Sequence, residues 1–260
     1  MPLREFPIGP VGEELFPRYV AGLAEALDDP ARDRNVVVRD ALAQLYLGRE
    51  VAHDELVRDS RTPPGIRALV ATFDPRNATL EAEYYREIDL AKWARVKPLL
   101  WFWQMFDHSP VGRNVRLGTQ VRFMLAKRVF KSCGEKVRIF HEVEFSFGYN
   151  LTVGNGVTIH RNVLIDDRGE VVIGDDASIS DYANIYSHAH AVEDIQDVSL
   201  HKTEIGARAR VTYHSVVLSG VKVGADAIVG SMGVASKPVE PGVIVGGIPA
   251  KPIGQKSVKS

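Results

Sequence analysis

The sequence contains a single cysteine, Cys133, among its 260 residues. One thiol cannot form an internal disulfide, so the composition excludes a disulfide-stabilised fold and fits a reducing compartment. No apolar run approaches the roughly 18 residues that a membrane-spanning helix needs. The first residues, MPLREFPIGPVGEEL, also contain no apolar segment of the signal-peptide kind. We therefore expect a cytoplasmic protein.

An excess of charge is absent as well, because 32 Lys and Arg residues stand against 33 Asp and Glu residues, for a net charge of −1. A chain this close to neutrality offers no overall field that would attract nucleic acid, so we expect no nucleic-acid partner. The hydrophobic fraction of 45% and the charged fraction of 25% are typical of a soluble globular protein. The length allows one large domain or two modest ones.

Helical spacing is present, but only in the first part of the chain. Apolar residues stand three and four positions apart in segments such as PRYVAGLAEALDD and NATLEAEYYREIDLAKWARVKPLLWFWQMF. This pattern predicts an α-helical N-terminal domain over residues 1–108. The segment contains no chemical motif that we can identify.

In the second part of the chain a step of six residues replaces the helical spacing. The aliphatic positions of this step form three series: Val153, Ile159 and Ile165; Ile173, Ile179 and Ile185; and Ile205, Val211, Val217, Val223, Val229 and Ala235. Two extra residues separate the first two series, and residues 191–203 interrupt the pattern before the third. Such a step suits short parallel strands joined by tight corners, three to a turn, so the sequence predicts a parallel β-helix.

The segments IGDDASISDYANI and VGADAIVGSMGVASKPVEPGVIVGGIPAKPI resemble the hexapeptide-repeat acyltransferases, particularly the maltose, galactoside and other sugar O-acetyltransferases. The ending GGIPAKPI is the most specific part. The resemblance implies a mainly β protein with a left-handed parallel β-helix over residues 133–254, a connector or cap at 109–132 and a tail at 255–260. It also implies a homotrimer, with acetyl-CoA lying along the groove between neighbouring subunits.

The motif ANIYSHAHAV, residues 183–192, offers two histidines for the reaction that this resemblance implies. Acyl transfer from a thioester to a hydroxyl needs a base, and imidazole, with an ordinary pKa near 6.5, is mostly neutral at cellular pH. The resemblance places His190 at the catalytic histidine of the family. His188 is then a neighbour that binds the acceptor or hydrogen-bonds the base. The alternative is that both histidines are solvent-exposed residues beside a loop.

The resemblance also implies residues that hold the two substrates. The candidates for acceptor binding are Asn162, Asp166, Asp167 and His160. The candidates for binding the coenzyme are Gly230, Ser231, Ser236, Lys237 and Lys251. His160 and Arg168 depart from the galactoside branch, which has an asparagine and an aspartate at these positions, so the departure puts the identity of the sugar in question. Each aspartate also suits the capping of a corner, and each lysine a solvated surface.

We predict an acetyl-CoA-dependent O-acetyltransferase that acts on a hydroxyl of a sugar or glycoconjugate by direct transfer, without a metal. One alternative is N-acetylation of an amino sugar. A second is a zinc hydrolyase like the gamma-type carbonic anhydrases, for which His160 and His214 could come close in neighbouring turns, and a third is a non-catalytic trimeric scaffold. Cys133 is predicted to be a buried structural thiol rather than an acyl carrier.

The segment 116–138 carries seven Lys and Arg residues against one Glu, interleaved with apolar residues at helical spacing. Such a basic amphipathic segment is typical of a peripheral contact with an anionic membrane. Its other interpretation is a cap over the end of the β-helix, which would otherwise expose aliphatic side chains and strand edges. A membrane-associated location therefore stands beside the cytoplasmic one.

Overall fold

The computed structural model describes residues 7–256. The chain forms two compact units that divide between Ala78 and Thr79. This division lies earlier than the boundary predicted after residue 108, because helix α5 (Leu90–Asp107) packs on α6 (Val115–Val129) within the second unit. Helical spacing shows that a helix has a buried face, but it does not show which core buries that face.

The first unit is helical, as its apolar spacing predicts. Its helices are α1 (Pro10–Asp28), α2 (Arg34–Leu47), α3 (His53–Arg58), α4 (Pro64–Thr72) and the 3-10 helix η1 (Pro75–Asn77). The side chain of Asp33 caps the start of α2 by accepting from the Asn35 amide at 2.9 Å. Gly48 ends that helix in the left-handed region, where glycine carries no steric penalty.

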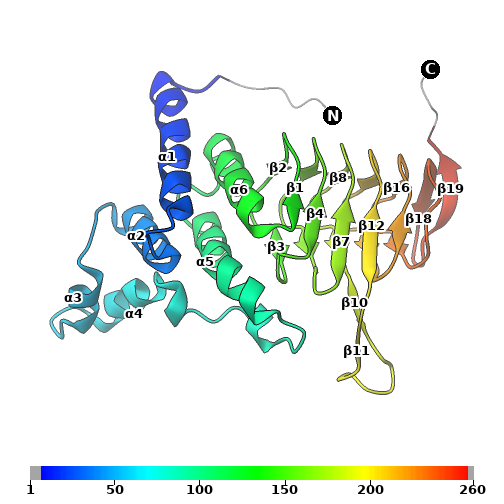
Figure 1. Ribbon diagram of the computed structural model, residues 1–260. Helices are drawn as coiled ribbons and strands as arrows, with labels where there is room; N and C mark the ends of the chain where they lie inside the picture. The colour runs from blue at the N-terminus through cyan, green and yellow to red at the C-terminus, as the bar shows by residue number, and fades with distance from the viewer. Residues whose placement is uncertain (1–6, 257–260) are drawn as a thin grey trace. The chain divides into compact units, whose positions relative to one another are not determined.

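The second unit contains the 3-10 helix η2 (Glu81–Tyr84), α5, α6 and a coil of short strands with three faces (Figure 1). One face consists of β1 (Ser132–Cys133), β4 (Leu151–Val153), β7 (Glu170–Ile173), β12 (Lys202–Ile205) and β15 (Lys222–Val223). The next consists of β2 (Arg138–Ile139), β5 (Thr158–Ile159), β8 (Ser178–Ile179), β13 (Arg210–Val211), β16 (Ile228–Val229), β18 (Val243–Gly246) and β19 (Lys251–Gln255). The third consists of β3 (Glu144–Phe145), β6 (Leu164–Ile165), β9 (Asn184–Ile185), β14 (Val216–Val217) and β17 (Val234–Ala235).

The core of the coil is built from the predicted six-residue series. Strands of successive turns pair in parallel and in register, so that Val153 lies beside Ile173 and Ile173 beside Ile205. Every member of the three series is buried. Glycine lets the turns stack closely, since a Cβ on Gly174 would lie 2.7 Å from the Ala207 nitrogen of the next turn. The structure confirms the predicted parallel β-helix.

The coil is wider at one corner in its early turns. Val172 and Lys222 occupy equivalent positions on the first face, because both stand in register with Glu204. Six residues lie between Ile165 and Val172 in the early turn, but only four lie between Val217 and Lys222 in the later one. The two extra residues noticed in the repeat therefore lie at the corner between the third face and the first. The sequence of this corner in the second turn is Asp-Asp-Arg-Gly, at 166–169.

The interruption of the repeat leaves the coil at the same corner, one turn later. It forms an antiparallel hairpin of β10 (His188–His190) and β11 (Val198–Leu200), which extends away from the coil in Figure 1. Both histidines of the motif lie in β10, at the base of this hairpin. The repeat thus places them on the widened corner.

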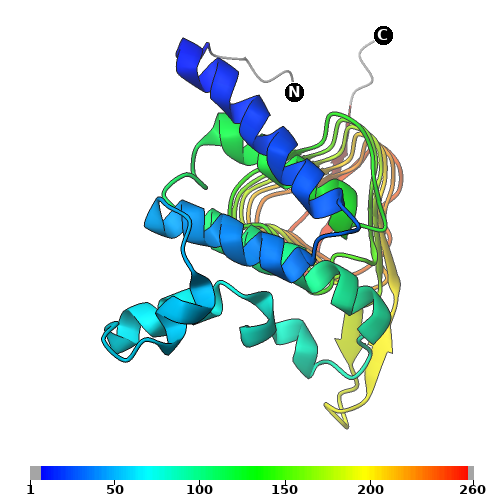
Figure 2. The ribbon, with the colours of Figure 1, turned by 60° about the vertical axis from the view of Figure 1, so that its left-hand side comes forward.

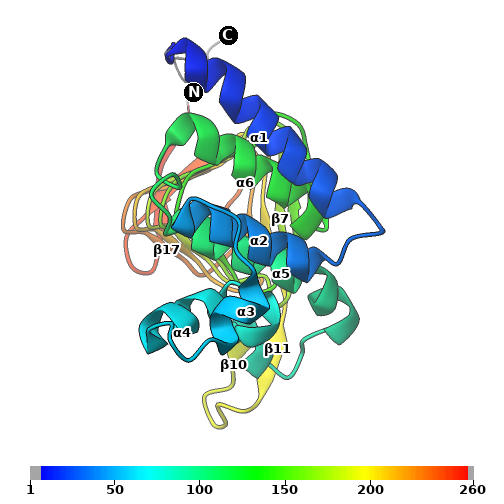
Figure 3. The same cartoon turned by 90° about the vertical axis from the view of Figure 1, so that its left-hand side faces the viewer.

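Helix α6 lies across the end of the coil where β1 and β2 begin, with α5 beside it (Figures 2 and 3). The apolar residues of α6 are buried there, among them Val121, Leu125 and Val129. Of the two interpretations of the basic segment, this packing supports the cap, because it already uses the apolar face that a membrane contact would need. No helix in residues 7–256 is both long and apolar enough to cross a bilayer.

The opposite end of the coil closes with β18 and β19, which pair in an antiparallel manner. The predicted tail begins at Gln255, the last residue of β19. The Lys256 amide still donates to the Gly242 carbonyl at 2.8 Å, so the ordered coil continues two residues into the tail. Residues 257–260 of the predicted tail lie outside the described residues.

Candidate functional site

A cleft of about 1040 Å³ lies in the second unit at the widened corner of the coil. One side is formed by the segment that includes η2, with Tyr85 and Glu87. The floor comes from the corner, with Asp166 and Arg168, and the other side comes from the hairpin. His188 and His190 both line the cleft, so the structure brings the two predicted catalytic histidines together in one cavity.

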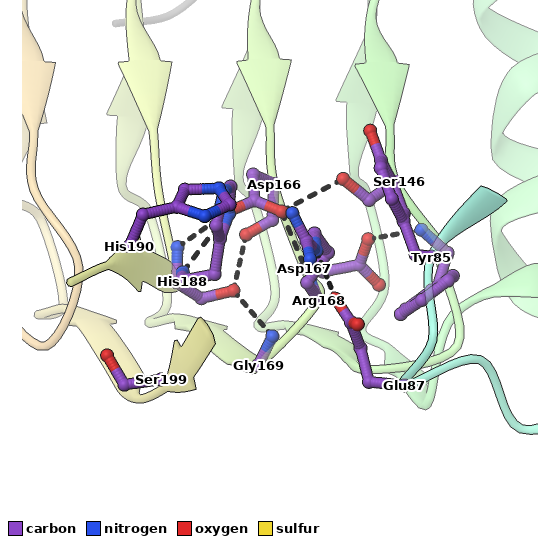
Figure 4. A network of polar contacts seen from close by, with 12 residues as sticks. Tyr85, Glu87, Ser146, Asp166, Asp167, Arg168, Gly169, His188, His190 and Ser199 are labelled. Carbon is purple, nitrogen blue, oxygen red and sulfur yellow. Dashed lines mark hydrogen bonds and ion pairs between the residues drawn. The ribbon is translucent and has the colours of Figure 1, made fainter. Parts of the chain in front are cut away.

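Asp166 fixes the position of His188 (Figure 4). The carboxylate of Asp166 is 3% exposed, and its Oδ2 lies 2.5 Å from Nδ1 of His188 and 3.1 Å from the Ser187 amide nitrogen. Its Oδ1 accepts from the Ser146 hydroxyl at 2.9 Å. Burial raises the pKa of Asp166, but the hydrogen bonds from His188 and Ser187 outweigh it and hold that pKa below its ordinary value. The ionised carboxylate therefore receives the Nδ1 proton of His188.

His190 is held by the backbone of its own hairpin. Its Nδ1 lies 2.6 Å from the Ile195 carbonyl oxygen. A carbonyl oxygen can only accept, so Nδ1 carries a proton, and in the neutral ring the lone pair then lies on Nε2. The two imidazole rings lie 5.1 Å apart, almost perpendicular to each other. The site thus contains two adjacent imidazoles that share one tautomer and leave Nε2 as the basic atom.

Asp167 points away from the cleft. It is fully buried, and its carboxylate accepts from the backbone amides of Phe147 at 2.7 Å and Asn150 at 3.1 Å in the preceding turn. Burial raises the pKa of Asp167 to about 6, against the lowering effect of these backbone hydrogen bonds. Asp167 therefore holds the backbone of the preceding turn and does not face the cleft, in contrast to the acceptor binding that the resemblance implied.

The other two acceptor candidates lie at a different corner, between the second face and the third. The ring of His160 stacks on Phe140 at 5.1 Å, and burial lowers the pKa of His160. The Asn162 side chain donates to Glu142 at 2.8 Å. Neither residue lines the cleft. Closeness to Asp166 in sequence did not predict their position, because a strand of the third face separates them from that residue.

His160 and His214 lie two turns apart in the coil, because β8 lies between β5 and β13, the strands that precede them. The ring of His214 stacks on Tyr182 at 4.8 Å. Within the described part of the chain, no group of three or more His, Cys, Asp or Glu side chains is arranged to hold a metal ion.

No motif or spacing in the sequence indicates the side of the cleft that precedes α5. In the sequence Arg168 is only a departure from the galactoside branch, whereas in the structure it pairs with Glu87 and stacks on Tyr85. Glu87 and Tyr85 belong to a stretch without a motif, about 80 residues before Arg168. Only a contact between such distant positions could have identified them.

Comparison with known proteins agrees with this geometry. No family model matches the chain. The galactoside O-acetyltransferase of Escherichia coli (strain K12) is 26% identical over 152 residues, which cover 57% of this chain and 72% of that protein. The dTDP-4-amino-4,6-dideoxy-D-glucose acyltransferase of Escherichia coli is 28% identical over 162 residues, which cover 50% and 84%. The chain is homologous to the hexapeptide-repeat acyltransferases.

Solved structures of this group share the fold. A galactoside acetyltransferase in complex with coenzyme A is 25% identical, with a TM-score of 0.57 over 65% of this chain and 82% of that one. A maltose O-acetyltransferase from Clostridium difficile is 19% identical and has a TM-score of 0.58 over 70% of this chain and all of that one. The coil is therefore the left-handed parallel β-helix of these acyltransferases.

The residues expected to contact the coenzyme lie outside the cleft of this acyltransferase homologue. Gly230 and Ser231 follow β16 at the corner between the second and third faces. Ser236 and Lys237 follow β17, two strands from β9 on the third face, and Lys251 begins β19. Both lysine side chains are exposed, and neither forms an ion pair within residues 7–256. Their charge suits phosphate groups, but a single chain does not gather these five residues at one place.

Cys133 is half-buried in β1, at the end of the coil that α6 covers, and it does not line the cleft. Burial raises the pKa of its thiol to about 11, so the reactive thiolate is scarce at neutral pH. We expect the Cys133→Ala variant to keep wild-type transfer activity, and iodoacetamide to modify the native thiol slowly. Loss of activity in this variant with an unchanged melting temperature would instead indicate an acyl-enzyme on Cys133.

Proposed function

We propose that the protein is an acetyl-CoA-dependent O-acetyltransferase that acts on a hydroxyl of a sugar or glycoconjugate. The observation that carries this proposal is the pair of imidazoles in one cleft, each with Nδ1 bonded to an acceptor and Nε2 available as a base. The names of the relatives support it, since they include a galactoside O-acetyltransferase, and one related structure contains coenzyme A.

In the proposed reaction His190 takes the proton of the acceptor hydroxyl on Nε2. Acetyl-CoA supplies an acetyl group activated as a thioester. As the hydroxyl oxygen forms its bond to the acetyl carbon, the carbon–sulfur bond breaks, and the proton passes from His190 to the departing sulfur. His188, held by Asp166, lies beside His190 and orients the acceptor. No covalent intermediate with the protein is needed.

The lining of the cleft suits a polyhydroxylated acceptor. Tyr84 and Tyr85 offer aromatic surface, on which the apolar face of a sugar ring can stack. Glu144 and Asp197 offer carboxylates that accept hydrogen bonds from hydroxyl groups. A cavity that combines aromatic surface with a few polar groups is the usual form of a small-molecule site.

The separation of the cleft from the coenzyme residues supports a homotrimer. In a single chain the imidazoles lie at one corner, while Gly230 and Ser231 lie at another. A symmetric assembly would place a corner of one subunit against the cleft of its neighbour and so complete the site. We propose that acetyl-CoA binds in such a groove between subunits.

N-acetylation of an amino sugar is the second candidate. One relative is named as an acyltransferase of an amino-deoxy sugar nucleotide. The carboxylates in the cleft, among them Glu81, Glu144 and Asp197, would also attract a protonated amine. The two candidates differ in which atom of the acceptor receives the acetyl group.

Thiol release from acetyl-CoA, measured with maltose, galactose, glucosamine and galactosamine, tests the proposal. We expect turnover with maltose or galactose and a product whose acetyl group mild alkali removes, as expected of an ester. Turnover restricted to the amino sugars, with an alkali-stable product, would favour N-acetylation. Calorimetry that detects no binding of coenzyme A would instead favour the scaffold, and a monomer on size-exclusion chromatography would contradict the homotrimer.

A further inference from the structure

Arg168 connects the coil to the opposite wall of the cleft (Figure 4). Its guanidinium forms an ion pair with the Glu87 carboxylate and lies over the Tyr85 ring, 4.1 Å from the ring centre. The side chains of Arg168 and Glu87 are 7% and 17% exposed, so water screens this pair far less than it screens a surface pair. Burial raises the pKa of Glu87, but the bond from Arg168 outweighs it and holds that pKa below its ordinary value.

The wall that Arg168 contacts has little regular structure of its own. Between Thr79 and Asp89 only η2 forms a helical turn. Two other contacts join this segment to the coil: the Tyr85 ring meets Phe147 edge to face at 6.1 Å, and the Asp89 amide donates to the Tyr149 hydroxyl at 3.0 Å. Arg168 contacts Tyr85 and Glu87 together. Helix η2 itself is held by α5, since Glu83 accepts from Lys97 at 2.8 Å and from Trp93 at 3.2 Å. The part of the wall at Tyr85 and Glu87 therefore depends on Arg168.

The same corner of the coil also holds the imidazoles. Asp166, which binds His188, stands two residues before Arg168, and the Arg168 amide donates to the Asp166 carboxylate at 3.3 Å. The corner thus fixes the aromatic wall through Arg168 and the imidazole through Asp166. The space between the wall and the imidazole is the space that an acceptor would fill.

We propose that Arg168 is a positioning residue that fixes the acceptor wall of the cleft and thereby sets the affinity for the acceptor. This inference rests on the proposed function. Arg168 does not contact the reacting atoms of the proposed reaction, and its effect passes through Tyr85 and Glu87. The planar guanidinium suits the task, because it pairs with a carboxylate and stacks on a ring at the same time, which the ammonium of lysine does poorly.

Steady-state kinetics with maltose and galactose test this role. We expect Arg168→Gln to raise KM for the acceptor by about tenfold or more, since small misplacements in a site carry large costs. Both kcat and KM for acetyl-CoA should stay within about threefold of the wild type. Arg168→Lys should recover part of the loss. Arg168→Gln already breaks the Arg168–Glu87 ion pair, so the double variant with Glu87→Gln should have the same acceptor KM as Arg168→Gln alone.

Arg208→Gln is the matched control, since it removes an arginine–carboxylate pair of the same coil outside the cleft. The Arg208 guanidinium lies 2.6 Å from the Asp226 carboxylate at an exposed corner between the first face and the second, and we expect this variant to match the wild type. An unchanged acceptor KM in Arg168→Gln, or an equal rise in Arg208→Gln, would overturn the inference. Effects of Arg168→Gln and Glu87→Gln that simply add in the double variant would also overturn it.

Hydrogen exchange measures the position of the wall without any turnover. In Arg168→Gln we expect the amides of residues 85–89 to exchange faster, while those of 164–173 stay protected. Unchanged exchange at 85–89 would contradict the positioning role. A wild-type protein that acetylates none of the sugars would contradict the proposed function, and the exchange result would still decide whether Arg168 holds the wall.

Discussion

Replacement of His190 by alanine is expected to lower kcat for acetyl transfer by about 10²–10⁴, the contribution typical of a positioned general base. Nε2 of His190 is the proposed acceptor of the hydroxyl proton, and its tautomer is fixed by the bond from Nδ1 to Ile195. Binding of acetyl-CoA should persist, because the residues proposed to hold the coenzyme lie at other corners of the coil. Thiol release measures the first quantity and calorimetry the second.

Two other histidines provide the comparison for this experiment. His188→Ala should lower kcat by about tenfold, as expected for a group that orients the acceptor without taking its proton. His201→Ala should match the wild type, since His201 is exposed, bonds to Ser199 at 3.0 Å and does not line the cleft. A larger loss in His188→Ala than in His190→Ala would transfer the role of base to His188, whose Nδ1 is bound by the Asp166 carboxylate.

The coil and its corner could be predicted from the sequence because both are written in local spacing. The buried series through Ile173, Ile179 and Ile185 needs only the six-residue step. The two inserted residues and the interruption at 191–203 likewise mark the place where the hairpin and the histidines leave the repeat. At both the insertion and the interruption, polar side chains stand where the repeat has small and aliphatic ones.

The rest of the site depends on contacts that spacing does not encode. Asp166 and Asp167 are identical neighbours, yet one faces His188 and the other faces backbone amides of the preceding turn. The direction of each side chain follows from the path of the corner. Tyr85 and Glu87 reach the cleft only because a helix and a cap intervene before the coil begins. A single sequence cannot reveal such pairing.

Replacement of Asp167 by alanine is expected to lower the free energy of unfolding by about 1–3 kcal/mol, because buried backbone amides lose their acceptor. The side chain of Asp167 accepts from the Phe147 and Asn150 amides, whereas alanine offers no acceptor. Chemical denaturation at pH 7 measures this loss.

Asp175→Ala is the matched control, because Asp175 accepts from the Asn155 amide of the preceding turn at 2.7 Å but is exposed. There water can replace the lost acceptor, so we expect a loss below about 1 kcal/mol. Equal losses in the two variants would contradict the view that burial makes Asp167 costly to replace.

The penalty for losing Asp167 should also depend on pH. Its pKa is raised to about 6 in the folded state from an ordinary value of 3.8, so the folded protein binds this proton more tightly than the unfolded chain does. Stability from this group is therefore greatest at low pH and declines as pH rises through about 4 to 6. Comparison with Asp167→Ala at each pH cancels the other carboxylates. Between pH 5 and pH 7 the advantage of the wild type should shrink by about 1 kcal/mol. An advantage that grows over this interval would show that the backbone amides outweigh burial and keep Asp167 ionised.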